Sequence, residues 1–195
     1  MLKIGLTGGI GSGKTTIAKA FSTSGYPVYI ADTEASRLIN HSSGIREALI
    51  RLFGKTIYHP DKTLDKRQLS TIIFNDKSLL QKVNRIVHPA VIQDFEEWCG
   101  KQQAPFVFFE SAILFEAGLA NYFDYVICVT AALQTRIARV MKRDGIPAEK
   151  VNERIRNQAE EEEKSKRANF VIDTTDGKDW QNQLSIIQDF LIHKQ

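Results

Sequence analysis

The sequence predicts an α/β protein with a parallel sheet, and three observations support this fold class. Short, continuous apolar runs recur along the chain, helical patterns separate them, and a glycine-rich loop follows the first run. Continuous apolar runs are typical of strands that are covered on both faces. Strands that alternate with helices favour a parallel sheet with right-handed crossovers.

The expected sheet begins with a βαβ unit. The apolar run 2–7 predicts a strand, 15–21 predicts a helix, and 27–30 predicts a second strand that ends at Ala31-Asp32. The same patterns predict further strands at 106–109, 125–129 and 170–172, and further helices at 133–142, 148–167 and 180–192. Helices are therefore expected on both faces of the sheet.

The segment 33–103 is mostly helical and contains no clear buried strand. It is too long for a simple crossover, so we interpret it as a helical insertion that grips a substrate. The nucleotide-binding core then comprises 1–32 and 104–195 of a single kinase chain. Helices are expected at 44–53, 66–74 and 77–98, with a kink or break at Pro89.

Length and composition indicate an ordinary globular protein. A chain of 195 residues can bury one sizeable core, and 43% hydrophobic with 25% charged residues excludes a disordered or fibrous chain. The 26 basic and 23 acidic residues leave a net charge of +3, which is too small to imply nucleic acid as a partner. The one biased segment, 160–167, is interpreted as a solvated helix face with spaced ion pairs rather than as a ligand site.

Targeting and redox signals are not apparent. Cys99 and Cys128 lack CxxC spacing, so neither a zinc site nor a disulfide framework is indicated. No cleavable leader precedes the first strand, and no apolar run approaches the roughly 20 residues of a membrane span. We therefore expect a cytoplasmic protein with no membrane partner.

The segment 8–15, Gly-Gly-Ile-Gly-Ser-Gly-Lys-Thr, satisfies G-x-x-x-x-G-K-[ST] between an expected strand and an expected helix. Glycines allow successive backbone N–H groups to point inward at phosphate oxygens, and the helix N-terminus adds partial positive charge. A glycine-rich turn without a ligand is the alternative. The residues expected to bind the nucleotide here are Gly8, Gly9, Gly11, Ser12, Gly13, Lys14, Thr15 and Thr16.

The phosphate loop predicts ATP as a substrate and Mg²⁺ as its metal. Lys14 is expected to reach the β- and γ-phosphates and to act in catalysis, while the Thr15 hydroxyl is a candidate Mg²⁺ ligand. A phosphate loop alone does not separate kinases from GTPase switches or motor ATPases. The chain lacks Asn-Lys-x-Asp for guanine selection and is short for a motor, which favours a small-molecule kinase.

Two acidic residues follow expected strands at the edge where ligands of parallel sheets collect. Asp32 could accept the proton of an attacking hydroxyl, or it could cap a helix over 33–40; spacing alone leaves both open. Glu110 ends the third strand and could lie near the Mg²⁺, or it could cap the following loop.

Phosphoryl transfer depends on charge neutralisation, so arginines that close over the γ-phosphate are sought in a lid. The segment 136–143 carries three arginines and is followed by a Gly-Ile-Pro turn. It is interpreted as part of a mobile lid over 136–167. The sequence points to the group of arginines rather than to one of them.

These residues resemble the dephospho-coenzyme A kinase family, whose members phosphorylate the ribose 3′-hydroxyl of dephospho-coenzyme A in the last step of coenzyme A synthesis. The similarity spans nearly the whole chain, and the Thr-Gly-Gly-Ile-Gly-Ser-Gly-Lys core is much narrower than the general loop pattern. It runs in family order through 5–16, Ala31-Asp32, Leu64-Asp65-Lys66-Arg67, His88-Pro89, Leu114-Phe115-Glu116, Gln134-Thr135-Arg136, 154–158 and 168–173.

The resemblance implies a phosphate-loop fold with three α/β/α layers, similar to nucleoside monophosphate kinases. It implies that Asp32 is the general base, with ATP and dephospho-coenzyme A as small-molecule substrates of a monomer or weak homo-oligomer. It places Asp65, Arg67 and His88 in the coenzyme A-binding insertion, although His88 could be a packing residue. Arg139 and Arg143 fall in the lid, Arg139 with a catalytic and Arg143 with a nucleotide-binding role.

The chain departs from the family pattern at three places. Ile30 stands where the family often has Asp, the segment 110–114 reads Glu-Ser-Ala-Ile-Leu where the family often has Asp-x-Pro-Leu-Leu, and Thr174 stands near a frequent Asn. These changes bear on the ligation of metal and water at Glu110 and on adenine contacts near Thr174, and not on the reaction class. A kinase of another nucleotide and a nucleotide-dependent switch are the competing hypotheses.

Overall fold

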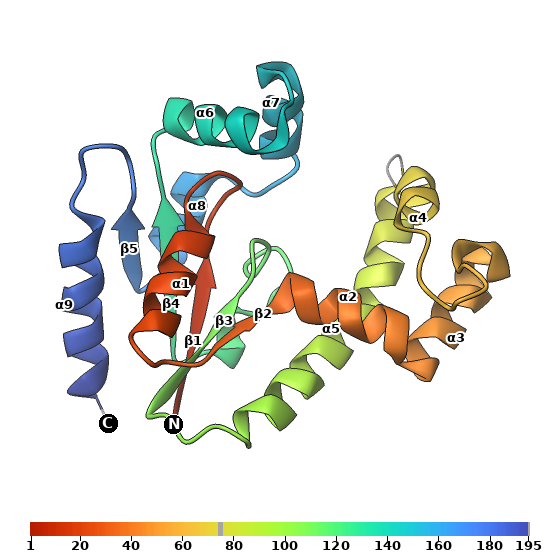
Figure 1. Cartoon of the computed structure of the whole chain (residues 1–195), viewed down its shortest axis with the longest axis horizontal. Coiled ribbons are helices and arrows are strands. Elements are labelled where there is room, and N and C mark those ends of the chain that lie inside the picture. The colour runs from red at the N-terminus through yellow and green to blue at the C-terminus, as the bar shows by residue number, and fades with distance from the viewer. Residues whose placement is uncertain (74–75, 195) are drawn as a thin grey trace. The chain divides into compact units, whose positions relative to one another are not determined.

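The computed structural model describes residues 1–73 and 76–194 (Figure 1). The chain divides into two compact units. One, the sheet unit, comprises Met1–Ile30 and Gln102–Gln195; the other, the helical unit, comprises Ala31–Lys101. No helix among the described residues is long and apolar enough to cross a membrane.

The sheet unit contains a five-stranded parallel sheet in the order β2-β3-β1-β4-β5, which confirms the predicted fold class. Parallel strands buried on both faces explain the continuous apolar runs, since β3 is buried along its whole length. Each of the five predicted strands is present within one or two residues of its expected ends. Their bounds are β1 Leu2–Thr7, β2 Val28–Ile30, β3 Phe106–Glu110, β4 Tyr125–Thr130 and β5 Phe170–Asp173.

Helices cover both faces of this sheet (Figure 1). Ile17 and Phe21 of α1 and Leu184 of α9 share one hydrophobic core with alternate residues of the strands, including Ile127. On the other face α8 packs against β4, where the Ser165 hydroxyl lies 3.8 Å from the Cys128 sulfur. The helices of the unit are α1 Lys14–Thr23, α6 Leu133–Asp144, α7 Ala148–Arg156, α8 Glu161–Arg167 and α9 Trp180–Ile192.

The single helix predicted over 148–167 is wrong, because α7 ends at Arg156 and α8 begins at Glu161. Polar groups between them bind elsewhere in the unit: the Gln158 Oε1 atom accepts a hydrogen bond from the Ile10 N–H, and the Ala159 N–H donates to Glu116. The bond from the Ala159 N–H to Glu116 takes the place of the backbone bond that a continuous helix would have given this group.

The helical unit, Ala31–Lys101, covers most of the segment 33–103 predicted to be an insertion, and its described residues contribute no strand to the sheet. Its helices are α2 Ala31–His41, α3 Ser43–Phe53, α4 Lys66–Ile73 and α5 Lys77–Cys99, and a short 3₁₀ turn, η1, spans Lys55–Ile57. Phe74, the last residue of the helix predicted over 66–74, lies outside the described residues. Apolar side chains at helical spacing, such as Leu49 and Val91, are buried in this unit.

Of the predicted kink or break at Pro89, the break is wrong, since α5 continues through this residue, and the kink stays a prediction. Pro89 lies on the exposed side of the helix, while Val87 and Val91 are buried on either side of it. Packing of the buried face therefore holds both halves in register despite the missing backbone donor. At the start of α5 the Asp76 carboxylate accepts from the Ser78 and Leu79 N–H groups.

The helix after β2 begins earlier than the sequence indicates. α2 starts at Ala31, directly after Ile30, so Asp32 lies inside the first helical turn with an exposed side chain. The interpretation of Asp32 as the cap of a helix over 33–40 is therefore wrong. A carboxylate in the first turn still interacts favourably with the helix dipole.

Candidate active site

The loop between β1 and α1 has a backbone conformation that favours glycine at three positions. Gly8, Gly11 and Gly13 have φ values of 146°, 80° and 89°, which residues with a Cβ rarely adopt. The space is restricted as well: a Cβ on Gly8 would lie 2.1 Å from the Val129 carbonyl oxygen. Glycine is therefore needed here for both conformation and close packing.

Lys14 and Glu110 come together at the carboxyl edge of the sheet. Glu110 ends β3, the strand beside β1, and its Oε1 atom lies 4.0 Å from the Lys14 Nζ atom. The two side chains are only 12% and 9% exposed, so their charges interact with less solvent screening than a surface pair. Glu110 therefore lies beside Lys14 of the loop, and its predicted place near Mg²⁺ stays a prediction.

The residues present at this edge fit a magnesium ion held mainly through the nucleotide. Thr15 lies exposed in the first turn of α1, and Glu110 supplies a carboxylate. No cluster of three metal-binding side chains occurs among the described residues. Mg²⁺ in nucleotide sites uses one or two protein oxygens together with phosphate and water oxygens, so this small donor set suits it.

The arginines of α6 differ in what they contact. Arg139 donates hydrogen bonds to the Thr174 carbonyl oxygen at 2.7 Å and to the Thr174 hydroxyl at 2.9 Å, and pairs with Asp176. Arg143 is 61% exposed and pairs with its neighbour Asp144, whose pKa it lowers. Arg136, which the sequence did not single out, is buried against the phosphate loop.

Thr174, one of the departures from the family pattern, supports the phosphate loop from the end of β5. Its hydroxyl donates to the Ser12 carbonyl oxygen at 2.7 Å, and the residue is buried. Sequence reasoning associated this position with adenine contacts and missed the bond to the loop. Only the parallel pairing of β4 with β5 brings residue 174 to the edge where residue 12 lies.

Lys164 is a second residue that the sequence did not reveal. The interpretation of 160–167 as a fully solvated face is wrong for Lys164, which is 1% exposed and pairs with Glu116 at 2.6 Å. It also donates to the Ala112 carbonyl oxygen at 2.8 Å, so α8 is tied to the loop that follows Glu110. The expectation holds for Lys166, which is exposed and pairs with Glu162.

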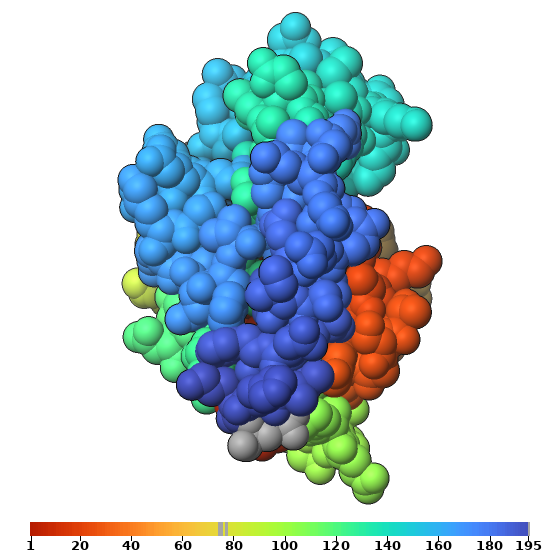
Figure 2. Space-filling model, turned by 90° about the vertical axis from the view of Figure 1, so that its left-hand side faces the viewer, coloured from red at the N-terminus to blue at the C-terminus, as the bar shows by residue number. Residues whose placement is uncertain are grey.

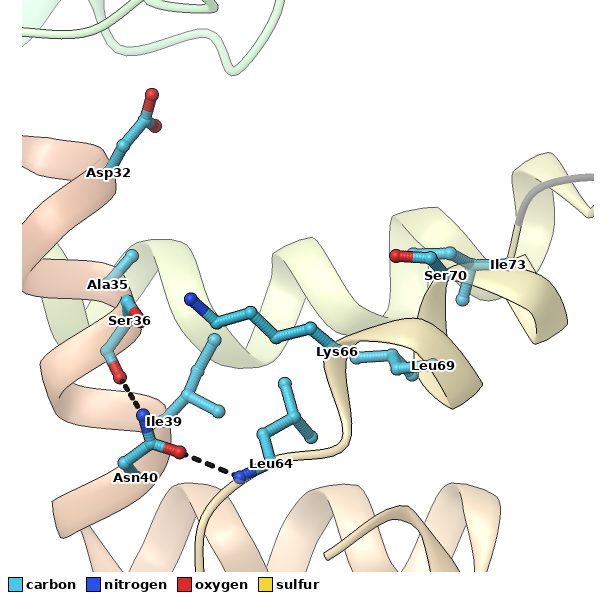
Figure 3. A pocket seen from close by; sticks show the side chains of 10 residues that line it. All are labelled: Asp32, Ala35, Ser36, Ile39, Asn40, Leu64, Lys66, Leu69, Ser70 and Ile73. Carbon is cyan, nitrogen blue, oxygen red and sulfur yellow. Dashed lines mark hydrogen bonds between the residues drawn. The ribbon is translucent and has the colours of Figure 1, made fainter.

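The helical unit contains a pocket of its own, with a volume of about 270 Å³ (Figure 3). Asp32 lies at one end of it, and the Lys66 side chain extends across it toward α2 (Figure 3). Most of the remaining surface is apolar. The lining residues are Asp32, Ala35, Ser36, Ile39, Asn40, Leu64, Lys66, Leu69, Ser70 and Ile73.

The three other residues predicted to bind the acceptor do not line this pocket. Asp65 accepts a hydrogen bond from the Gln68 N–H at 2.9 Å and so caps α4. Arg67 is exposed, and His88 is half-buried on α5, where burial lowers its pKa. Lys66, between two of the predicted residues, is the one whose side chain enters the pocket.

The parallel sheet, the glycine loop and the Lys14–Glu110 pair define the class of this protein: it is a phosphate-loop protein with a nucleotide-kinase-like fold. The sequence model of dephospho-CoA kinase matches residues 2–179. The chain therefore belongs to the dephospho-CoA kinase family. It is a kinase-family enzyme, and this family phosphorylates dephospho-CoA with ATP in coenzyme A biosynthesis.

Curated relatives carry the same name. The dephospho-CoA kinase of Bacteroides fragilis is 39% identical over 172 residues, which cover 88% of this chain and 83% of the relative. That of Thermus thermophilus is also 39% identical over 172 residues, covering 88% and 82%. The family model spans the whole helical unit and the sheet unit as far as residue 179.

Solved structures agree with the fold. The crystal structure of TT1252 from Thermus thermophilus has a TM-score of 0.85 and 35% identity, and covers 99% of this chain and 97% of its own. A shikimate kinase from Bacteroides thetaiotaomicron has a TM-score of 0.55 at 16% identity, covering 97% and 98%, which supports the fold alone.

Proposed function

We propose that this protein transfers the γ-phosphoryl group of ATP to the ribose 3′-hydroxyl of dephospho-CoA, giving coenzyme A and ADP. The observation that carries the proposal is the glycine loop, with its positive φ values, together with Lys14 and Glu110 at one sheet edge. Family membership supplies the acceptor, and the pocket of the helical unit supplies a place for part of it.

On the nucleotide side, the loop residues act by position and charge. Backbone N–H groups of the loop face the β-phosphate, apart from those of Ile10, Ser12 and Thr16, which donate within the protein. Lys14 neutralises the charge that develops between the β- and γ-phosphates. Glu110, 4.0 Å from Lys14, keeps the ammonium group at this edge before ATP arrives. Arg139 and Arg143 then approach the nucleotide from the lid, 136–167.

Thr15 and Glu110 are the residues that would hold Mg²⁺, Thr15 directly and Glu110 directly or through water. When bound, the ion neutralises phosphate charge during transfer. Glutamate in place of the family's frequent aspartate is one methylene longer, so its carboxylate reaches further toward the phosphates from the same strand end.

On the acceptor side, Asp32 is the group that takes the proton of the attacking hydroxyl. It lies two residues beyond Ile30, which is the register partner of Glu110 in the sheet. Asp32 also lines the pocket of the helical unit, whose apolar walls suit the nucleobase or an aliphatic arm of the acceptor. The Lys66 ammonium in this pocket suits a phosphate of the acceptor. The assignment of Asp65, Arg67 and His88 to acceptor binding stays a prediction.

The test is formation of coenzyme A and ADP by the purified protein with ATP, Mg²⁺ and dephospho-CoA. Shikimate, nucleosides and nucleoside monophosphates at equal concentration serve as competing acceptors. Of these acceptors, we expect only dephospho-CoA to support multiple turnovers. We expect no turnover when EDTA removes the metal. Preferential turnover of another acceptor, or no turnover with a protein that binds ATP, would overturn the proposed substrate.

Asp32→Asn tests the base. It keeps the size of the side chain and removes its basicity, so we expect turnover to fall by about 10²- to 10⁴-fold. ATP affinity, measured by calorimetry, stays unchanged. Asp61→Asn, an exposed change in the same unit outside the pocket, is the matched control. Normal turnover of Asp32→Asn would exclude a catalytic role for this carboxylate.

A further inference from the structure

Both polar backbone groups of Ile10, the third residue of the phosphate loop, are bonded to side chains far away in the sequence. The Gln158 Oε1 atom accepts a hydrogen bond from the Ile10 N–H at 2.8 Å. The Arg136 Nε–H group donates to the Ile10 carbonyl oxygen at 3.0 Å. Neither partner belongs to the loop pattern, and neither is explained by the nucleotide contacts proposed above.

Arg136 is fixed in this position by more than one hydrogen bond. Its guanidinium pairs with the Glu161 carboxylate at the start of α8, and the residue is only 6% exposed. Burial lowers its pKa, as expected for a cation removed from water. A buried guanidinium costs free energy unless its donors are paired, so the loop carbonyl and Glu161 together account for its stable placement.

The loop is also shaped to receive this guanidinium. A Cβ on Gly9 would lie 2.3 Å from the Arg136 Nη2 atom, and a Cβ on Gly11 would lie 2.6 Å from the Arg136 carbonyl oxygen. Two glycines of the loop therefore leave space for one residue of α6. The glycine pattern serves packing against Arg136 in addition to its conformational role.

A glycine-rich loop loses more conformational entropy when it becomes ordered than other loops do. If the free loop adopted many shapes, the affinity for a nucleotide would fall in proportion to the fraction of loops in the binding shape. Side chains that already hold the loop remove that cost before the ligand binds. Arg136 and Gln158 bond to Ile10 from outside the loop, so these contacts do not depend on a ligand and can supply such an effect.

We propose that Arg136 and Gln158 are positioning residues that hold the phosphate loop in its phosphate-binding shape before the nucleotide arrives. They act through Ile10, and neither contacts the transferred phosphoryl group. The inference rests on the proposed function, because it takes the loop to be the ATP site. It predicts that the affinities for ADP and for ATP depend equally on these two residues.

The test compares the binding of ADP and ATP to Arg136→Met and Gln158→Met by calorimetry with Mg²⁺. We expect the Kd of both nucleotides to rise by about tenfold or more for Arg136→Met and by about threefold for Gln158→Met. Comparing ATP with ADP, which lacks the γ-phosphate, separates an arginine that positions the loop from one that contacts the γ-phosphate. A Kd that rises for ATP and not for ADP means direct contact with the γ-phosphate and overturns the proposal.

Matched variants separate this role from general damage. Arg51→Met removes an exposed arginine from α3, outside the loop and the lid, and leaves both Kd values unchanged. Arg136→Lys keeps the charge and one donor, so its Kd values fall between those of the wild type and Arg136→Met. If Arg136→Met does not fold, Gln158→Met decides alone, because it is neutral and similar in length. Wild-type ADP affinity in the folded variants overturns the proposal.

The outcome is independent of the acceptor. A wild-type protein that does not bind ATP contradicts the proposed function itself. A wild-type protein that phosphorylates dephospho-CoA, together with Arg136 and Gln158 variants that bind ADP normally, contradicts only the positioning role.

Discussion

Lys14 and Glu110 form a partly buried pair, and we propose its cation as the counter-ion of the triphosphate. Lys14→Ala is expected to lower kcat/KM by about 10²- to 10³-fold, because the transferred charge loses a preorganised partner. The fold survives, since the loop backbone is held by Arg136, Gln158 and Thr174. Steady-state kinetics and circular dichroism measure the two effects.

Lys19→Ala, an exposed change on the same helix, is the control for Lys14→Ala. It removes one positive charge near the same helix without touching the loop, so activity stays normal. Nearly normal kcat/KM in Lys14→Ala would contradict the role of the ammonium group.

Gly8 combines an unusual backbone conformation with a lack of space. Gly8→Ala is expected to cost more than the roughly 1–2 kcal/mol that a left-handed conformation costs an L-residue, because the new Cβ meets the Val129 carbonyl oxygen. Gly25→Ala is the matched control: its φ is 88°, yet nothing lies within 4 Å of the added Cβ. The free energy of unfolding in urea, compared between the two variants, isolates the clash. Equal losses would contradict the packing argument.

At the scale of residues, the sequence predicts what is local and misses what the fold assembles. Gly8, Lys14 and Thr15 are recognisable because one short segment contains the whole loop. Arg136, Thr174 and Lys164 matter through partners that lie far away along the chain. The neighbouring sequence does not show that Arg136 and Lys164 are buried cations rather than solvated ones, or that Thr174 bonds to the loop. Only the tertiary structure reveals these roles.

At the scale of elements, strands were predicted more accurately than helix ends. Each strand forms an uninterrupted apolar run, whereas the ends of α7 and α8 depend on where Gln158 and Ala159 bond. The continuity of α5 depends on the buried Val87 and Val91 that flank Pro89. Tertiary contacts overrode the local signal in both cases.

Asp65 is expected to act through the helix that it caps. Asp65→Ala removes the acceptor of the Gln68 N–H and should destabilise the protein by about 1 kcal/mol. Because α4 carries Lys66 and Leu69 into the pocket, the KM for dephospho-CoA should rise as well. Asp65→Asn keeps an oxygen acceptor and should restore both quantities. A KM that stays high in Asp65→Asn would mean that the carboxylate charge itself binds the acceptor.

His88 makes α5 sensitive to acid. Burial lowers the pKa of His88 below its ordinary value of 6.5, so the unfolded chain binds a proton more readily than the folded one. Stability is therefore lost as the pH falls from about 6.5 toward the lowered pKa, and it is unaffected by His88 above that range. His88→Gln should flatten this part of the profile, measured as the urea midpoint between pH 7.5 and 5.

His59→Gln, an exposed histidine of the same unit, is the control for His88→Gln. A wild-type profile that is retained in His88→Gln would show that another group causes the acid sensitivity. A change in the KM for dephospho-CoA without a change in the profile would instead support the predicted contact with the acceptor.

At the scale of the whole molecule, the chain divides into two compact units, and we assign nucleotide binding to the sheet unit and acceptor binding to the helical unit. The covalent order explains this division: the chain leaves the sheet after β2 and returns at β3, so the helical unit is one continuous insertion (Figure 1). Residues of the C-terminal segment complete the sheet unit, and the blue residues of this segment cover the middle of the face seen in Figure 2. Length and apolar pattern predict such an insertion, but the pocket within it depends on side chains from α2 and α4 that no sequence motif brings together.

If the two units bind different substrates, each substrate should stabilise its own unit. We expect ADP with Mg²⁺ to slow amide hydrogen exchange in the phosphate loop, α1 and α6, because ordering of the loop and its supporting residues suppresses local opening. Dephospho-CoA alone should slow exchange in α2 and α4, which line the pocket. Mass spectrometry of peptides from the described segments measures both. Protection of α2 and α4 that is lost in Lys66→Met, with ADP protection of α1 retained, would tie the acceptor to this pocket; protection by dephospho-CoA in the sheet unit alone would contradict it.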